Sequence, residues 1–423
     1  MARFGLNIDY KSIKMKNNRR RFLSNLGSAT IMIPSLIKGY TSSELQHFSP
    51  ERLNETNISI WDLDTPSLCV DLDILEANLS KLQAITTQNG IAARPHAKTH
   101  KCPQIARLQM AAGSIGICVA KISEAEVMFD HGIDKILCTT TNVTQDKIKR
   151  AMSLKKWCPD FIQATDSPAN ARLLSEAASA MGITADIVVD VDPGMHRTGI
   201  PAGEPALQLA QLVDQLPSLR LRGILCYDGG SQHVSGFEAR KKQTLDRLAA
   251  AADTVGMMRK AGLNTEIFSG GGTGTYNIDH ENEGFTDVQA GSYVFMDNQY
   301  MAIGGEHNTD VYDDFRPSLT ILTTVLNDQY EGRVTTDAGA KACTINQPWP
   351  AVKGQSGMDY RSGSDEFGTL IFNDPSRTYR VGEKLELIVS HCDPVVNLYD
   401  QMYAIRNEKV EAIWKIYGRG KSS

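Results

Sequence analysis

The chain has 423 residues, of which 41% are hydrophobic and 22% are charged, values typical of an ordinary globular protein with room for a large core. The formal net charge of −5 hides an asymmetry, because residues 1–40 carry eight basic side chains and one acidic side chain, which leaves a net charge of −12 on the remainder. An acidic body argues against nucleic acid and against an anionic membrane surface as partners.

The first 40 residues resemble a twin-arginine export leader. The stretch "NNRRRFLSNLG" places Arg19 and Arg20 directly ahead of a mildly apolar run that is too interrupted to be a clear membrane span. We therefore expect export to the periplasm, with a cytoplasmic protein bearing a basic tail as the alternative. Membrane contact is expected only if the leader is retained as an anchor.

Residues 41–64 are expected to be a linker, with the first strand of a C-terminal β domain as the alternative for part of this stretch. From residue 65 to about residue 300, short apolar runs alternate with helical patterns. We count eight runs as strands: "SLCVD", "IAARPHA", "IGICVA", "KILCTT", "FIQAT", "ADIVVDVD", "LRGILCYD" and "TEIFSGGG". Continuous apolar strands alternating with helices predict an α/β fold, a (β/α)8 barrel of the TIM type, and a doubly wound open sheet is the alternative.

Helix start and stop signals separate these strands. Capping boxes are expected at Asp73 with Glu76 and at Ser123 with Glu126. Another helix should begin at Ser167 and end at Gly182, and a long helix is expected over residues 236–261. After residue 300 the pattern changes to β-type runs with turn residues, which predicts a mostly β C-terminal domain over residues 301–423. The eight scattered cysteines are expected to be small buried hydrophobic residues.

Polar chemistry follows the predicted barrel strands at their carboxyl ends, where the active site of such a barrel lies. These ends carry His96 and Lys98, Asp190 and Asp192, Tyr227 and Asp228, and the glycine-rich stretch Ser269–Gly274. Backbone N–H groups of a glycine-rich turn are able to hold a single phosphate. A lysine amine and a phosphate cradle in one cleft point to pyridoxal 5′-phosphate, whereas a strand-end lysine taken alone is more often a solvated charge.

Six stretches then carry a resemblance to a known family: "TPSLCVDLDILEANL", "RPHAKTHK", "VDPGMHRTG", "SGGGTGTY", "GSYVFMD" and "SHCDPVVNLYD". In this order they resemble the metal-dependent D-threonine aldolase / D-serine dehydratase family, whose alanine-racemase-like fold is a barrel followed by a β domain. The resemblance implies that Lys98 is the Schiff-base lysine and that Arg197 and Tyr227 contact the cofactor. It also implies that Gly271, Gly272 and Thr273 hold the phosphate and that the protein is a homodimer.

Two further motifs bear on the reaction. Family aldolases carry His-x-Asp where dehydratases carry His-x-Cys, so the resemblance implies that His391 and Asp393 bind a divalent metal. Mn²⁺ is expected first, with Zn²⁺ as the alternative, and Cys392 is a neighbouring rival ligand. The resemblance also implies that His233 is the catalytic base, while Asp228 departs from the family's usual histidine.

The expected function is cleavage of a D-β-hydroxy-α-amino acid of the D-threonine type to glycine and an aldehyde. The alternatives are a dehydratase acting on D-serine or D-3-hydroxyaspartate and a non-catalytic protein that binds the cofactor or an amino acid. A zinc site formed by His96, His100 and Cys102 is a weaker interpretation of the "RPHAKTHKC" stretch.

Overall fold

The computed structural model describes residues 40–45, 48, 53 and 56–423, and residues 40–423 form one compact unit. The expected export leader lies outside the described residues. Among the residues that are described, no helix has both the length and the apolar character needed to cross a membrane.

The first sheet has nine parallel strands, of which eight follow the spatial order β2-β10-β9-β8-β6-β5-β4-β3. The ninth, β7 (Ile200–Pro201), pairs with β6 outside this path. Hydrogen bonds between residues 93–97 and residues 115–118, including the bridge between His96 and Cys118, join the two end strands and close the ring. The expected barrel is therefore confirmed. Its strands are β2 (Ala92–Ala93), β3 (Ile117–Val119), β4 (Ile136–Cys138), β5 (Ile162–Thr165), β6 (Ala185–Asp192), β8 (Leu219–Cys226), β9 (Ile267–Gly270) and β10 (Asp287–Val288).

Side chains alternate between the two faces of each barrel strand, and both faces are apolar because both are buried. Inward-pointing residues form a separate small core that draws on six successive strands: Cys118, Leu137, Ile162, Ala164, Val188, Leu225 and Ile267. Their neighbours in the chain belong instead to the main core. The lower barrel is thus filled by side chains, and open space remains at the carboxyl ends of the strands.

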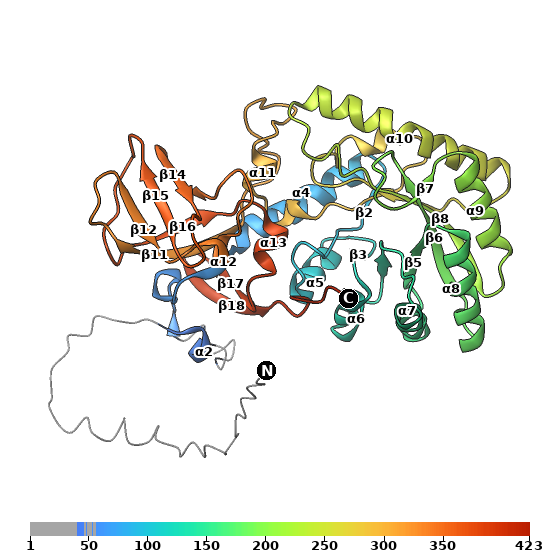
Figure 1. Cartoon of the computed structure of the whole chain (residues 1–423), viewed down its shortest axis with the longest axis horizontal. Coiled ribbons are helices and arrows are strands. Elements are labelled where there is room, and N and C mark those ends of the chain that lie inside the picture. The colour runs from blue at the N-terminus through green and yellow to red at the C-terminus, as the bar shows by residue number, and fades with distance from the viewer. Residues whose placement is uncertain (1–39, 46–47, 49–52, 54–55) are drawn as a thin grey trace, which may run out of the picture. The chain divides into compact units, whose positions relative to one another are not determined.

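Helices surround the barrel on its outer face, as Figure 1 shows for α8 and α9. The helix expected after Ser167 is confirmed, with Ser167 as N-cap, Pro168 at the first position and Gly182 at the C-cap in the left-handed conformation. The helices in this part are α4 (Leu72–Gln88), α5 (Pro103–Ala111), α6 (Ile122–Asp130), α7 (Gln145–Trp157), α8 (Pro168–Met181), α9 (Glu204–Gln215), α10 (Phe237–Lys260) and α11 (Asn298–Met301).

The second sheet is mostly antiparallel and follows the order β14-β15-β12-β11-β1-β17-β18, with β16 also paired to β11 and β13 paired to β16. The short helices α12 (Ala340–Cys343) and α13 (Cys392–Val396) lie between its strands in the sequence. The strands are β1 (Ser67–Asp71), β11 (Leu319–Asn327), β12 (Arg333–Thr336), β13 (Ala351–Val352), β14 (Met358–Arg361), β15 (Gly368–Phe372), β16 (Lys384–Ile388), β17 (Gln401–Arg406) and β18 (Lys409–Lys415).

One strand assignment from the sequence is wrong. The run "SLCVD" is β1, which pairs with β11 and β17 in the second sheet and not with any barrel strand. The eighth barrel strand is instead the two-residue β10, which pairs with β9 on one side and β2 on the other. An apolar run signals a strand but does not say which sheet receives it, and two residues are too few to produce an alternating pattern.

Two expected capping boxes are also displaced by two residues. The N-cap of α4 is Asp71, whose side chain accepts a hydrogen bond from the N–H of Ile74. Asp73 and Glu76 instead pair with Arg406 from the second sheet. The N-cap of α6 is Lys121, and Glu124 takes the third position.

Candidate active site

Two adjoining cavities open at the carboxyl ends of the barrel strands, the place that the fold class predicts. One cavity of about 250 Å³ contacts the ends of β2, β3, β4, β6 and β8. A smaller one of about 100 Å³ also contacts His391 and Asp393, which follow β16 of the second sheet. Both are lined by His96, Lys98, Tyr227 and Gln289. Lys98 therefore lies where the two cavities meet.

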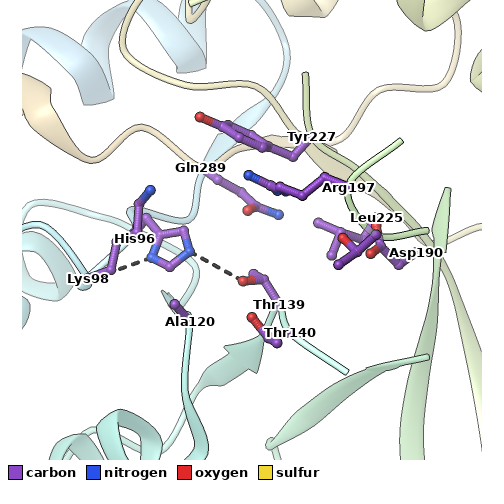
Figure 2. Close-up of a pocket in the computed structure, with 11 residues that line it drawn as sticks. His96, Lys98, Ala120, Thr139, Thr140, Asp190, Arg197, Leu225, Tyr227 and Gln289 are labelled. Carbon is purple, nitrogen blue, oxygen red and sulfur yellow. Dashed lines mark hydrogen bonds between the residues drawn. The ribbon is translucent and has the colours of Figure 1, made fainter. Parts of the chain in front are cut away.

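Lys98 is held on a short turn after β2 by His96. Figure 2 shows the two residues on one side of the larger cavity, facing Arg197 and Tyr227 on the other. The backbone N–H of Lys98 donates to Nδ1 of His96 at 3.3 Å, so the ring proton resides on Nε2, which lies 3.3 Å from the Thr139 hydroxyl. Burial, reinforced by the Lys98 charge, lowers the pKa of His96 well below its usual value. His96 is thus a neutral support for the Lys98 turn.

The Lys98 amine is half-buried and lies 3.6 Å from a carboxylate oxygen of Asp393. Burial opposes the positive charge, but the Asp393 charge, assisted by Tyr227, more than offsets it, so the pKa of Lys98 is raised. Arg197 comes from the loop after β6, and its guanidinium carbon lies 5.2 Å from the centre of the Tyr227 ring. Asp190, at the end of β6, lines the same cavity, and burial raises its pKa to about 7.

The glycine-rich loop follows β9 and supplies Gly272 and Thr273 to the smaller cavity, together with Gly291 and Ser292 from the loop after β10. Gly271 precedes them in the left-handed conformation, with φ of +64°. A Cβ atom at Gly271 would lie 1.9 Å from an Asp279 carboxylate oxygen. Only glycine therefore fits the backbone path that carries Gly272 and Thr273 to the cavity wall.

His233 reaches the smaller cavity from the loop after β8. Its ring packs against Tyr300, with ring centroids 4.4 Å apart, although the residue as a whole is exposed. Loss of water around the packed part of the ring lowers the pKa of His233. The lowered pKa favours the neutral imidazole, which is the form that accepts a proton.

His391 and Asp393 also line this cavity. Nδ1 of His391 lies 3.0 Å from Oδ2 of Asp297, and this oxygen also accepts the N–H of Cys392 at 3.0 Å. The contact with Asp297 places the ring proton on Nδ1 and leaves Nε2 of His391 as a free lone pair. Asp297, His391 and Cys392 also offer three possible metal ligands within 4.8 Å of one another.

The sequence left Cys392 as a rival of Asp393 for the metal, and the local structure separates the two side chains. These residues begin the short helix α13, with His391 as its N-cap. Cys392 is fully buried in the main core and does not line the cavity, whereas Asp393 does.

The weaker zinc interpretation of the "RPHAKTHKC" stretch finds no support in the geometry. Nδ1 of His100 accepts the N–H of Cys102 at 3.1 Å, and its Nε2 lies 3.2 Å from the Gln109 side-chain oxygen, so both ring nitrogens are engaged. His96 is engaged in the same way. All eight cysteines are buried and free, as the sequence predicted.

Several residues at the site were missed by sequence reasoning. Thr139, Gln289, Gly291, Ser292 and Tyr300 line the cavities, and Asp297 orients His391. Most of them lie just after a barrel strand, which was the available signal, but a single threonine or glutamine there resembles any loop residue. Asp297 had only the signal of a helix N-cap, a role that it also fills by accepting the N–H of Tyr300 at 3.0 Å.

Two family models match the chain. The model described as "Alanine racemase, N-terminal domain" matches residues 70–299, and the model described as "Putative serine dehydratase domain" matches residues 318–405. The barrel and the strands that follow it thus define an enzyme with the alanine-racemase-like fold.

Comparison with individual proteins identifies the family within this fold class. The chain is 36% identical to a D-threonine aldolase from Arthrobacter sp. over 85% of its length and 94% of that protein. It is 34% identical to a 3-hydroxy-D-aspartate aldolase from Paracoccus denitrificans over 85% and 93%. The crystal structure of D-threonine aldolase from Filomicrobium marinum superposes with a TM-score of 0.83 at 34% identity, covering 89% of this chain and all of that one. The chain belongs to the D-threonine aldolase / D-serine dehydratase family of pyridoxal phosphate-dependent lyases, which confirms the resemblance drawn from its motifs.

Replacing Gly271 by alanine is expected to weaken binding of pyridoxal phosphate and to lower thermal stability. The left-handed backbone alone costs a residue with a Cβ atom roughly 1–2 kcal/mol, and the contact with Asp279 adds to it. Gly256→Ala in α10 is the matched control, because a Cβ there meets nothing within 4 Å and alanine favours the helix. Cofactor titration and thermal melting check both variants. Unchanged affinity and stability in Gly271→Ala would contradict the account of this loop.

Proposed function

We propose that the protein is a pyridoxal phosphate- and divalent-metal-dependent aldolase that cleaves D-β-hydroxy-α-amino acids of the D-threonine type to glycine and an aldehyde. The observation that carries the proposal is the meeting of Lys98, His233, His391 and Asp393 around one cavity. A cofactor amine partner, a neutral base and two metal-type ligands are the groups that this reaction requires. The identity to two aldolases over most of the chain supports the same reaction.

The residues present fit both groups. Lys98 would hold pyridoxal phosphate through its amine, Arg197 and Tyr227 lie across the cavity from that amine, and the loop at Gly271–Thr273 would hold the phosphate. His391 has a free Nε2 and Asp393 a carboxylate, which together suit a divalent cation, Mn²⁺ before Zn²⁺ because the second ligand is an oxygen. Thr99 lines the same cavity, and its hydroxyl lies beside the Asp393 carboxylate.

Asp297 positions the proposed metal ligand His391 and does not itself bind the metal. Its Oδ2 already receives the His391 ring N–H and the Cys392 backbone N–H. A carboxylate placed in this way fixes the tautomer and direction of a ligating histidine.

When bound, pyridoxal phosphate supplies an electron sink for the cleaved Cα–Cβ bond, and the metal makes the substrate hydroxyl more acidic. The protein's own part in this step is the transfer of one proton. His233 accepts the proton of the β-hydroxyl, and its lowered pKa keeps Nε2 or Nδ1 available for that proton at neutral pH. Tyr300 stacks on the ring and restricts its direction.

Replacing His233 by alanine is expected to lower D-threonine cleavage by roughly 100-fold or more while cofactor and metal still bind, as for loss of a general base. Activity of the wild type should fall as pH decreases through the His233 pKa, because the protonated ring no longer accepts a proton. The measurement is glycine and acetaldehyde formation at saturating cofactor across a pH series. Full activity in His233→Ala would remove this residue from the mechanism.

A dehydratase is the second candidate, and the family model matched at residues 318–405 favours it. In that reaction the Lys98 amine would remove the Cα proton while hydroxide leaves from Cβ. Purified protein with pyridoxal phosphate and Mn²⁺ separates the two. Glycine and aldehyde from D-threonine support the aldolase, and pyruvate and ammonia from D-serine without aldol cleavage would overturn it. A homodimer stays a prediction of the family resemblance that light scattering checks.

A further inference from the structure

The glycine-rich loop and the segment that carries His233 are joined by two buried side chains. One is Arg240, whose guanidinium donates to the backbone oxygens of Gly274 and Val234. The other is Gln232, which is 1% exposed. Its carbonyl oxygen accepts the N–H of Gly274 at 3.0 Å. Its amide nitrogen donates to the Thr275 hydroxyl at 3.0 Å and to the backbone oxygen of Asp228 at 3.1 Å. A backbone N–H only donates and a backbone carbonyl only accepts, so these partners fix the direction of the amide.

The hydrogen bonds continue from Thr275 to the cavity side of the loop. The Thr275 hydroxyl accepts the N–H of Gly272 at 3.2 Å and donates to Asp279 at 2.7 Å. Thr275 and Asp279 are both buried, and Gly272 lines the smaller cavity. The position of Gly272 is therefore set from behind by Thr275, which Gln232 in turn contacts.

The glycine-rich loop and the His233 segment are in close contact. A Cβ atom at Gly272 would lie 2.5 Å from the Gln232 side-chain oxygen, and one at Gly274 would lie 2.2 Å from the Gln232 backbone oxygen. Two backbones that approach this closely cannot shift independently. A displacement of the glycine-rich loop is thus transmitted to residue 232 and to its neighbour His233.

The start of the His233 segment is held separately. Asp228 pairs with Arg247 at 3.0 Å and accepts the N–H of Gly230 at 2.9 Å. This anchor belongs to β8 and α10 and does not involve the glycine-rich loop. Arg240 links Gly274 to Val234, whereas Gln232 directly precedes His233 and also bonds Thr275, which holds the N–H of Gly272. Gln232 is therefore the side chain that connects the cavity side of the loop to His233.

We propose that Gln232 is a positioning residue that couples occupancy of the phosphate loop to placement of the base. A phosphate held at Gly271–Thr273 fixes the positions of Gly272 and Gly274. Because Gln232 is bonded to this loop, its position and that of the adjacent His233 are fixed as well. Substrate then meets an ordered base only when the phosphorylated cofactor is in place. The inference rests on the proposed function for the roles of the two segments, and it gives Gln232 a role in positioning the base.

The test compares pyridoxal phosphate with pyridoxal, which lacks the phosphate, by amide hydrogen exchange in the wild type and in Gln232→Leu. In the wild type, the phosphorylated form should slow exchange over residues 229–236 more than pyridoxal does. In Gln232→Leu this difference should vanish, pyridoxal phosphate should bind roughly tenfold more weakly, and kcat should fall at saturating cofactor. A residue that only stabilises the fold would not abolish a difference that depends on the phosphate alone.

Gln243→Leu is the matched control, because Gln243 donates to the backbone oxygen of Gly230 in the same segment from an exposed position and does not touch the glycine-rich loop. It should keep the exchange difference. If Gln232→Leu does not fold, Thr275→Val interrupts the same chain of hydrogen bonds and should give the same loss. A wild-type difference that persists in the folded variant overturns the coupling. Absence of D-threonine cleavage by the wild type would instead overturn the proposed function and leave the exchange result intact.

Discussion

Replacing Lys98 by alanine is expected to abolish turnover of D-threonine and covalent attachment of pyridoxal phosphate together. Among the described residues that line the two cavities, Lys98 is the one lysine, and it lies where they meet. Its amine is the group in reach of both the Arg197 side and the metal side of the site. Borohydride treatment of the wild type with pyridoxal phosphate should attach a pyridoxyl group to a peptide that contains Lys98, as mass spectrometry would detect.

The neighbouring lysines provide the controls for this experiment. Lys101 forms an ion pair with Glu124, with its Nζ atom 2.6 Å from the carboxylate, and does not line either cavity. Lys121, at the start of α6, also lies outside both linings, so Lys121→Ala should keep turnover and label. A pyridoxyl group on Lys101 or Lys121, or turnover that survives in Lys98→Ala, would show that the cofactor is bound elsewhere.

The site could be anticipated from the sequence because a parallel barrel gathers its strand ends at one face. Lys98, Tyr227 and Gly272 are far apart in the chain, yet each follows an apolar run directly, and one rule places them together. The same rule covers Asp190, which lies at the end of β6 and lines the larger cavity. A polar residue directly after an apolar strand can therefore be assigned to the site once the barrel fold is predicted.

The parts that escaped prediction depend on contacts between distant segments. β1 looks like a barrel strand by composition, and only its pairing with Leu319–Leu322 of β11 and with β17 assigns it to the other sheet. Asp297 and His391 are separated by 94 positions, and no pattern within either segment announces their contact. Gln232 was visible in the sequence as the neighbour of His233, but its bond to Gly274 belongs to the folded chain.

Chelation of divalent metal is expected to abolish aldol cleavage without releasing pyridoxal phosphate. The two groups are held by different residues, the cofactor on the barrel side by Lys98 and the metal on the side of His391 and Asp393. Mn²⁺ should restore activity after removal of the chelator. Cofactor absorbance, metal content and product formation are measured on the same sample. Full activity of metal-free protein would contradict the proposed role of the metal.

Variants of the metal side should then rank the three candidate ligands. Asp393→Ala is expected to lose both metal and activity. Asp297→Asn should bind metal roughly 10- to 100-fold more weakly, because it orients His391 from behind and does not contact the ion. Asp393→Cys should shift the preference toward Zn²⁺, since a thiolate is a softer ligand than a carboxylate.

Cys392→Ser is the deciding control, because the Cys392 sulfur lies within 4.8 Å of the ligand atoms of Asp297 and His391 and yet packs wholly in the core. Its sulfur does not line the cavity that His391 and Asp393 line. If His391 and Asp393 bind the metal, serine at position 392 should leave metal content and cleavage close to the wild type. The buried hydroxyl should cause at most a small loss of stability. A large loss of metal in Cys392→Ser combined with normal metal binding in Asp393→Ala would reverse the assignment. The site would then be a His-Cys centre of the kind that favours Zn²⁺.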